Sequence, residues 1–139
     1  MRDPELIAEA GRWLRFARED LVTAEGLRRT QGRFIPRHVC WLAQQAAEKA
    51  LKAALILEGV DFPFRHDLDA LRNLLPEGWS VKDEHPDLTE LTEWAVEARY
   101  PGDWPDPTVK DADRALAQAR GVLESVVRDC AKRGVQQEG

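Results

Sequence analysis

Four polar side chains recur at helical spacing in an otherwise apolar segment, namely Gln45, Glu48, Lys49 and Lys52. On a helix they fall on one side. Glu48 precedes Lys52 by four residues, the better orientation for a helical ion pair. The stripe is either a solvated face with weak ion pairs or a ligand-facing surface whose lysines meet phosphate. Trp41, one turn before Gln45, would add an aromatic suited to base stacking or to a protein interface.

A second candidate is the segment from Arg99 to Trp104, which contains Tyr100, the only tyrosine of the chain. Pro101, Pro105 and Pro107 forbid a regular helix from Arg99 to Pro107. An arginine and two aromatics in a rigid loop could bind a base and a phosphate, although the same residues could seal one end of the fold or contact another protein. Asp103 works against phosphate binding because it adds negative charge. We predict a nucleotide- or partner-binding site, with ATP or GTP as the candidate ligand, made of Gln45, Lys49, Lys52, Arg99, Tyr100 and Trp104.

Other reactive side chains show no pattern of a catalytic or metal site. His38, His66 and His85 are scattered, and no metal-binding histidine motif occurs. His66 precedes Asp67 at the expected start of a helix, which favours a capping or loop role. The two cysteines lie in apolar helical patterns and should be buried thiols. Neither a glycine-rich phosphate loop nor a G-x-S-x-G sequence is present, so we expect no metal site and no conventional hydrolase.

Asp20 falls at the margin of the buried face of the first expected helix. A carboxylate in such a place needs a partner or water. A salt bridge is the usual solution, so we expect one here.

The elements that would carry these residues are all helical. Apolar periodicity predicts helices over residues 3–28, 36–57, 68–75, 88–98 and 109–130. Asp3 with Pro4 should begin the first helix, Gly59 should end the second, and Thr108 with Asp111 should form a capping box for the fifth. We predict an all-α fold, an antiparallel up-and-down bundle of four long helices plus a short one. Residues 1–133 would form a single domain, and residues 134–139 would be a frayed tail.

Composition sets the wider limits. The chain has 139 residues, 43% hydrophobic and 32% charged, which suits one globular domain. A net charge of −5 argues against general polyanion binding, so contact with nucleic acid would need a local basic patch or a second copy of the chain. The N-terminus has no apolar core of a signal peptide, and no apolar stretch is long enough for a membrane span. We therefore expect a cytoplasmic protein without membrane contact.

Four segments, taken in order, resemble one known family. The string AQQAAEKALKA at residues 43–53 resembles the central-helix signature of HEPN domains (higher eukaryotes and prokaryotes nucleotide-binding). The spacing of Trp13, Ala17, Asp20, Leu21 and Ala24 is similar to the first helix of that family. The stretch from His66 to Leu71 resembles the entry to its third helix, and residues 98–101 with 112–119 resemble its C-terminal part. The resemblance covers about residues 6–127.

The resemblance implies a helical bundle that is usually dimeric. Family members include RNase toxins, partners of small nucleotidyltransferases in two-gene modules, and nucleotide-binding domains. The RNase members carry R-x(4–6)-H, in which arginine and histidine act on the scissile phosphate. Arg99 matches the arginine, but no histidine follows it; Asp106 stands at one of the positions where a histidine is expected, and Asp103 lies just before them. Arg33 and His38 do have this spacing, but the match has little weight because one such hit is expected by chance.

Three functions remain from the sequence. The first is a HEPN subunit, without catalytic activity of its own, that docks on a small nucleotidyltransferase in a toxin–antitoxin-like module and helps to bind its nucleotide. The second is an RNase toxin with a degenerate site around Arg99, acting on RNA. The third is a purely structural dimer. Surplus apolar surface on the second helix and five tryptophans predict a homodimer in each case.

Overall fold

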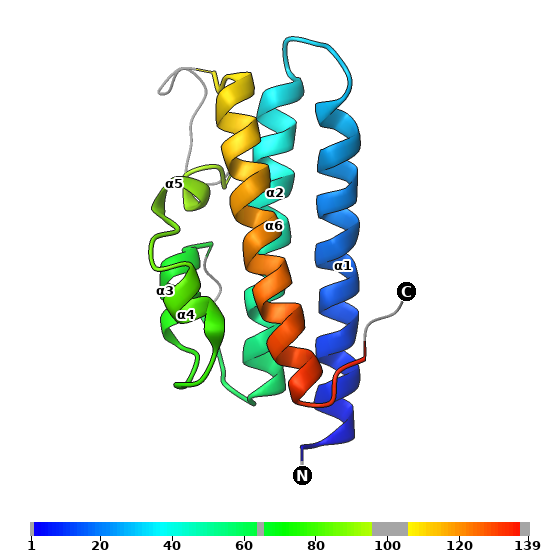
Figure 1. The fold of residues 1–139 in the computed structure, drawn as a ribbon, viewed down its shortest axis with the longest axis vertical. Coiled ribbons are helices and arrows are strands. Elements are labelled where there is room, and N and C mark those ends of the chain that lie inside the picture. Colours follow the sequence, from blue (N-terminus) through cyan, green and yellow to red (C-terminus); the bar gives the residue numbers. More distant parts are fainter. Residues whose placement is uncertain (1, 64–65, 96–105, 137–139) are drawn as a thin grey trace.

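The computed structural model describes residues 2–63, 66–95 and 106–136. Three long helices lie side by side: α1 (Pro4–Arg28), α2 (Ile35–Leu57) and α6 (Val109–Lys132). Three short helices lie on the side of α2 and α6 away from α1, namely α3 (Leu68–Asn73), α4 (Ser80–Glu84) and α5 (Thr89–Thr92) (Figure 1). The prediction of an all-α helical bundle is confirmed. Within the described ranges no helix is long and apolar enough to span a membrane.

The ends of the long helices follow from local chemistry. Asp3 accepts a hydrogen bond from the Glu5 backbone N–H at 2.8 Å, and Pro4 opens α1. Thr108 and Asp111 form the expected capping box at the start of α6. Gly59 follows α2 with a φ of +67°, a backbone conformation that glycine adopts without strain. These predicted boundaries are confirmed.

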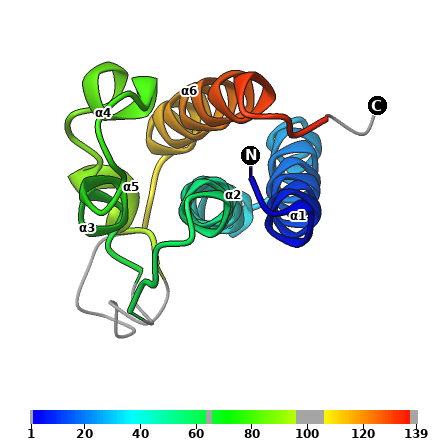
Figure 2. The ribbon, with the colours of Figure 1, turned by 90° about the horizontal axis from the view of Figure 1, so that it is seen from below.

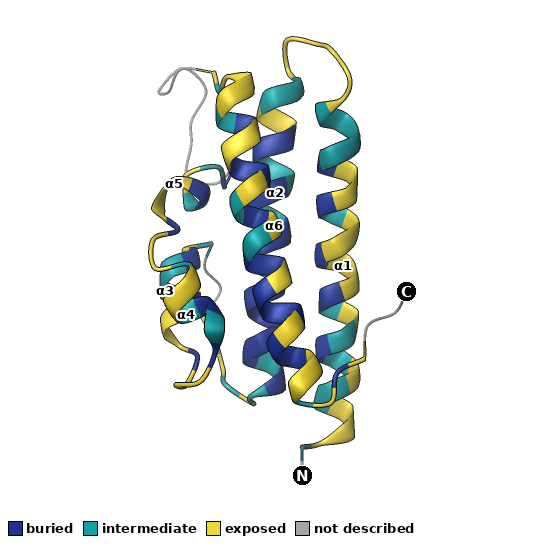
Figure 3. Ribbon diagram, in the orientation of Figure 1, coloured by how far each residue is buried: buried dark blue, intermediate teal, exposed yellow. Residues whose placement is uncertain are grey.

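Helix α2 is the centre of the fold. Figure 2 shows it between α1, α6 and α3, and Figure 3 shows how little of it is exposed. Its buried alanines leave no accessible surface and let the neighbouring backbones approach closely; they are Ala43, Ala46, Ala47, Ala50, Ala53 and Ala54. The thiol of Cys40 on this helix and that of Cys130 on α6 are buried, as predicted.

The segment between α3 and α6 differs from its prediction. A long fourth helix was expected over residues 88–98, but the chain forms the short α5 and then turns. The backbone N–H groups of Trp94 and Ala95 bond to carbonyls only three residues back, at 3.2 and 3.1 Å, which ends regular α-helix. The Leu88 N–H is held by Asp69 Oδ1 at 2.9 Å, which fixes where α5 begins. Residues 96–105 lie outside the described residues.

Helix α4 was not predicted, and α6 holds it in place. Asp129, 1% exposed on α6, accepts hydrogen bonds from the Ser80 backbone N–H at 2.5 Å and from its hydroxyl at 3.1 Å. The guanidinium of Arg133 lies 4.1 Å from the ring centroid of Trp79. With short helices in place of a fourth long one, α2 and α6 run in the same direction, antiparallel to α1 (Figure 1).

The C-terminal residues pack more closely than expected. The tail was predicted to fray from Gly134, but Val135 is only 3% exposed and its N–H bonds to the Cys130 carbonyl at 3.1 Å. Gly134 has a φ of +96°, which turns the chain back toward Ile7 of α1. The prediction was wrong at this position because the polar composition of the tail conceals one apolar anchor.

Candidate functional site

Two of the four residues in the polar stripe of α2, Glu48 and Lys52, are buried, whereas Gln45 and Lys49 are partly exposed. Lys52 donates to Glu48 Oε2 at 2.9 Å, and the two residues are 6% and 5% exposed. Both had been expected on an accessible stripe. They are buried because Trp13 of α1 and Phe62, in the segment after α2, cover them: the Lys52 ammonium lies 6.0 Å from the Trp13 ring centroid and 5.6 Å from that of Phe62. Aromatic faces suit a cation held there.

Glu48 is the centre of a hydrogen-bonded cluster. Its Oε1 lies 2.7 Å from His66 Nδ1 and accepts from Gln44 Nε2 at 3.1 Å. The Gln44 amide also donates to the His66 carbonyl at 3.3 Å and accepts from Gln45 Nε2 at 2.7 Å. Glutamine, carboxylate, lysine and histidine thus satisfy one another, which is the condition for keeping a charged group in an apolar core. We call Gln44, Glu48, Lys52 and His66 the buried polar cluster.

The cluster keeps its carboxylate ionised. Burial disfavours the charged form of Glu48 and pushes its pKa up, but hydrogen bonds from His66, Lys52 and Gln44 outweigh burial and hold the pKa below its usual value. A charged carboxylate accepts hydrogen bonds and does not donate them, so Nδ1 of His66 carries the proton on that side. The arrangement fixes the orientation of the imidazole ring.

A second ion pair lies beside the cluster. Lys49 Nζ lies 2.5 Å from Asp20 Oδ2 and joins α2 to α1, with side chains 29% and 20% exposed. The salt bridge expected for Asp20 is confirmed. Its partner is one of the lysines predicted to meet phosphate, so neither Lys49 nor Lys52 offers an uncommitted charge to a ligand.

Half of the predicted site is described, and that half does come together. Gln45, Lys49 and Lys52 lie on the side of α2 that faces α1 and the segment leading to α3. Figure 2 shows no described helix over the side of α2 opposite α6. Arg99, Tyr100 and Trp104 lie outside the described residues, as does Asp103, so their distance from α2 stays a prediction.

His66 is the site residue that sequence reasoning missed. Its loop position was predicted, but Asp67 is the residue that caps α3, accepting from the Ala70 N–H at 3.2 Å. The imidazole instead reaches Glu48, eighteen positions earlier in the chain. Helical spacing relates residues three or four apart and cannot reveal such a contact. The only signal was that His66 lay in one of the segments that resembled the HEPN pattern.

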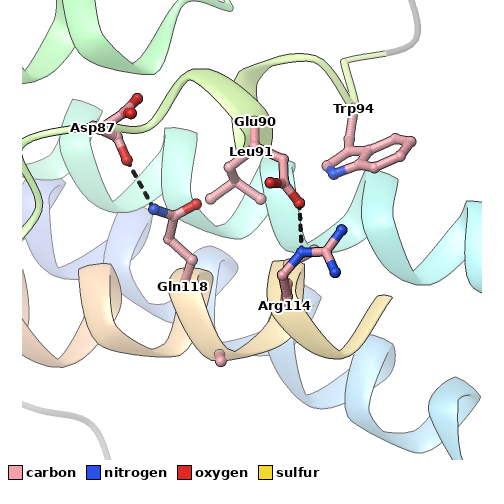
Figure 4. Close-up of a pocket in the computed structure, with 8 residues that line it drawn as sticks. Asp87, Glu90, Leu91, Trp94, Arg114 and Gln118 are labelled. Carbon is pink, nitrogen blue, oxygen red and sulfur yellow. Dashed lines mark hydrogen bonds and ion pairs between the residues drawn. The ribbon is translucent and has the colours of Figure 1, made fainter. Parts of the chain in front are cut away.

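A groove between α5 and α6 was also not predicted. It has a volume of about 510 Å³ and is lined by Leu91, Trp94 and Ala115 with polar neighbours (Figure 4). Glu90 accepts from Arg114 Nε at 2.9 Å, so the arginine there is already neutralised. Across the described ranges, no group of three or more histidine, cysteine, aspartate or glutamate residues is placed to hold a metal ion.

Comparison with known proteins gives two matches. The family model of the HEPN domain matches residues 10–130. A protein of Methanocaldococcus jannaschii named "Putative toxin MJ1304" is 35% identical over 136 residues, covering 86% of each chain. No solved structure gives a significant match.

Proposed function

The chain belongs to the HEPN domain family, and from this premise we propose that it is the HEPN subunit of a two-gene, toxin–antitoxin-like module. In that role it docks on a small nucleotidyltransferase and contributes to the site for the nucleotide of that enzyme. The similarity to a relative named as a toxin, which spans most of both chains, supports the toxin–antitoxin-like setting.

The observation that carries this proposal is the state of the α2 lysines. Lys52 is committed to Glu48 and Lys49 to Asp20, so binding a phosphate would first require breaking an ion pair. A protein surface needs no such exchange, because partly exposed polar and aromatic side chains can dock as they stand. Trp13, Trp41, Gln45 and Lys49 are all partly exposed. The geometry therefore favours a docking face, which we define by these four residues, over a free nucleotide site.

A binding measurement tests the proposal. The adjacent gene should encode a small protein with the G-S-x(8–13)-D-x-D pattern of a nucleotidyltransferase, and the two purified proteins should bind in calorimetry. The triple variant Asp20→Ala/Trp41→Ala/Lys49→Ala should weaken binding about tenfold or more, because it removes an aromatic side chain of the docking face and the ion pair beside it. The matched control Glu84→Ala/Arg128→Ala removes an exposed pair of similar length, 2.7 Å, elsewhere on the surface and should leave binding unchanged.

Two outcomes would contradict docking at this face. One is equal affinity of the two variants, and the other is absence of any complex at micromolar concentration. Titration of the isolated chain with ATP or GTP tests the alternative, that this chain binds a nucleotide without a partner. Millimolar-range binding lost in Lys49→Ala/Lys52→Ala would show a nucleotide site within the chain itself.

The second candidate function is an RNase toxin; the name of the relative, "Putative toxin", supports only the toxin part of this description. Metal-independent cleavage needs a general acid–base partner for the arginine, and no histidine follows Arg99. We expect little cleavage of mixed RNA, with or without divalent metal. Robust cleavage abolished by Arg99→Ala would establish this second function with its site at Arg99. If His38→Ala abolished the cleavage instead, the catalytic site would be Arg33 with His38.

A further inference from the structure

Positive charge is concentrated at the end of the bundle where α1 connects to α2. Between Glu25 and Glu48 the sequence has four arginines and no carboxylate, although the net charge of the chain is −5. The connection between the helices projects at the top of Figure 1, beside the first turn of α6. We call Arg29, Arg33, Phe34 and Arg37 the arginine end.

The charges of the arginine end are not neutralised by neighbouring side chains. Arg28, one residue earlier, is paired with Asp113 on α6 at 2.5 Å. Arg29, Arg33 and Arg37 are exposed, and within the described ranges no carboxylate lies at ion-pair distance from them. Exposed arginines elsewhere do have such partners, as in the pairs of Arg12 with Glu9, Arg15 with Glu19 and Arg128 with Glu84. Three guanidinium groups are therefore open to an external anion.

The start of α2 adds to the positive potential. Helices α1 and α6 begin with side-chain caps and an acidic residue in the first turn, whereas α2 has neither. Its first turn carries Arg37 instead. A cationic side chain near a helix N-terminus opposes the helix dipole, so a bound polyanion would relieve an unfavourable interaction present in the free protein.

An aromatic ring stands among these charges. Phe34 is 62% exposed, and the Arg33 guanidinium lies 5.8 Å from its ring centroid. A groove of about 340 Å³ lies at the same end of the bundle, lined by residues that include Gly32, Ile35 and Val109. An exposed ring flanked by guanidinium groups is the combination that stacks a base while neighbouring phosphates are neutralised.

We propose that the arginine end binds single-stranded nucleic acid, with Arg29, Arg33 and Arg37 on the phosphates and Phe34 stacked on a base. Guanidinium groups pair with phosphate bidentately. The exposed ring argues for unpaired bases over an acidic protein, since carboxylates have no face for it to stack on, and over a duplex, whose bases are already stacked. Arg37 lies one turn of α2 before Trp41 of the docking face, but the two surfaces share no residue, and nucleic-acid binding here does not depend on the proposed partner.

Fluorescence anisotropy with a labelled single-stranded RNA of mixed sequence tests the proposal on the full chain. A length of roughly 12 nucleotides lies within the usual range of single-strand site sizes. The variant Arg29→Gln/Arg33→Gln/Arg37→Gln should lower affinity at least tenfold. It should also reduce the slope of log affinity against log salt by about 2, the value for three phosphate contacts on a single strand. Phe34→Leu should weaken binding about fivefold or more with the salt slope unchanged, because it removes stacking and keeps every charge.

The matched control is Arg12→Gln/Arg15→Gln/Arg128→Gln, which removes the same charge from paired, exposed arginines and should bind like the wild type. Circular dichroism checks that each variant is folded, and Arg33→Gln alone serves as the test if the triple variant is not. Equal binding by the triple variant and the control would overturn the proposal. The proposal would also be overturned if the protein bound a duplex, of RNA or of DNA, more tightly than it bound either of the separated strands. Binding of a polyglutamate peptide without binding of RNA would show that the arginine end docks an acidic protein instead.

Discussion

Glu48 and Lys52 were predictable as a pair but not as a buried one. Their four-residue spacing predicts the contact, which forms at 2.9 Å. Their burial depends on Trp13, Phe62 and His66, which come from other parts of the chain. Four polar residues on one side of a helix predict a solvent-exposed face unless the residues that cover them are known. For this reason the sequence placed Glu48 and Lys52 at the surface.

Removing one member of this pair should cost more than removing both. Lys52→Met leaves the Glu48 carboxylate buried without its cation, and we expect a loss of about 3 kcal/mol in unfolding free energy. Glu48→Leu/Lys52→Met removes both charges of the pair and should recover much of that loss, because apolar replacement of a whole buried pair is often nearly neutral. Urea unfolding of the two variants and the wild type measures both values. A double variant less stable than Lys52→Met would contradict this account.

The lowered pKa of Glu48 makes its contribution dependent on pH. Since the folded-state pKa lies below the ordinary value of 4.5, the contribution is complete above 4.5 and declines as pH falls through the folded-state pKa. The stability difference between wild type and Glu48→Gln should therefore shrink as the pH falls below about 4.5. Several other carboxylates also have lowered pKa values, and subtracting the variant removes their effect. A stability difference that grows below that pH would refute the lowered pKa.

At the scale of the helices, boundaries set by local chemistry were predicted well. Asp3, Gly59 and the pair of Thr108 with Asp111 all act within a few residues of the helix end that they define. The start of the segment at Leu88 was predicted, but its early end was not, because the N–H groups of Trp94 and Ala95 bond to carbonyls only three residues back. Apolar spacing reports which face of a segment is buried, but it does not report where the helix stops.

Two helical glycines give a matched test of packing between α4 and α6. A Cβ added at Gly121 would lie 2.6 Å from the His85 ring, whereas one added at Gly11 would meet only Val135, at 3.9 Å. Gly11→Ala should stabilise the protein by about 0.5–1 kcal/mol through helix propensity. Gly121→Ala should destabilise it by about 1 kcal/mol, because displacing the imidazole costs more than propensity gains. Thermal unfolding compares the two, and a gain in stability from Gly121→Ala would show that His85 moves without cost.

At the scale of the whole molecule, we expect a homodimer. The side of α2 opposite α6 has no described helix over it (Figure 2), and the exposed Phe16 adds apolar surface on neighbouring α1. A stable dimer buries about 1,600 Å² in total. Light scattering at micromolar concentration should give twice the chain mass of 15.8 kDa. Because this side of α2 includes the docking face, a dimer formed through it would compete with the proposed partner. Finding only the single-chain mass would remove this expectation.

The common direction of α2 and α6 has a consequence for the order of folding. Helices α1 and α2 are joined by a short connection, so they can pair as an antiparallel hairpin soon after both are synthesised. Helix α6 begins at Val109, long after α2 ends at Leu57, and must close a much larger loop before it can pack. We therefore expect pulse-labelled hydrogen exchange to show amide protection in α1 and α2 before α6. Until α6 arrives, the hairpin leaves apolar residues of α2 exposed, and a ribosome-bound chain at that stage would be a natural client for a chaperone.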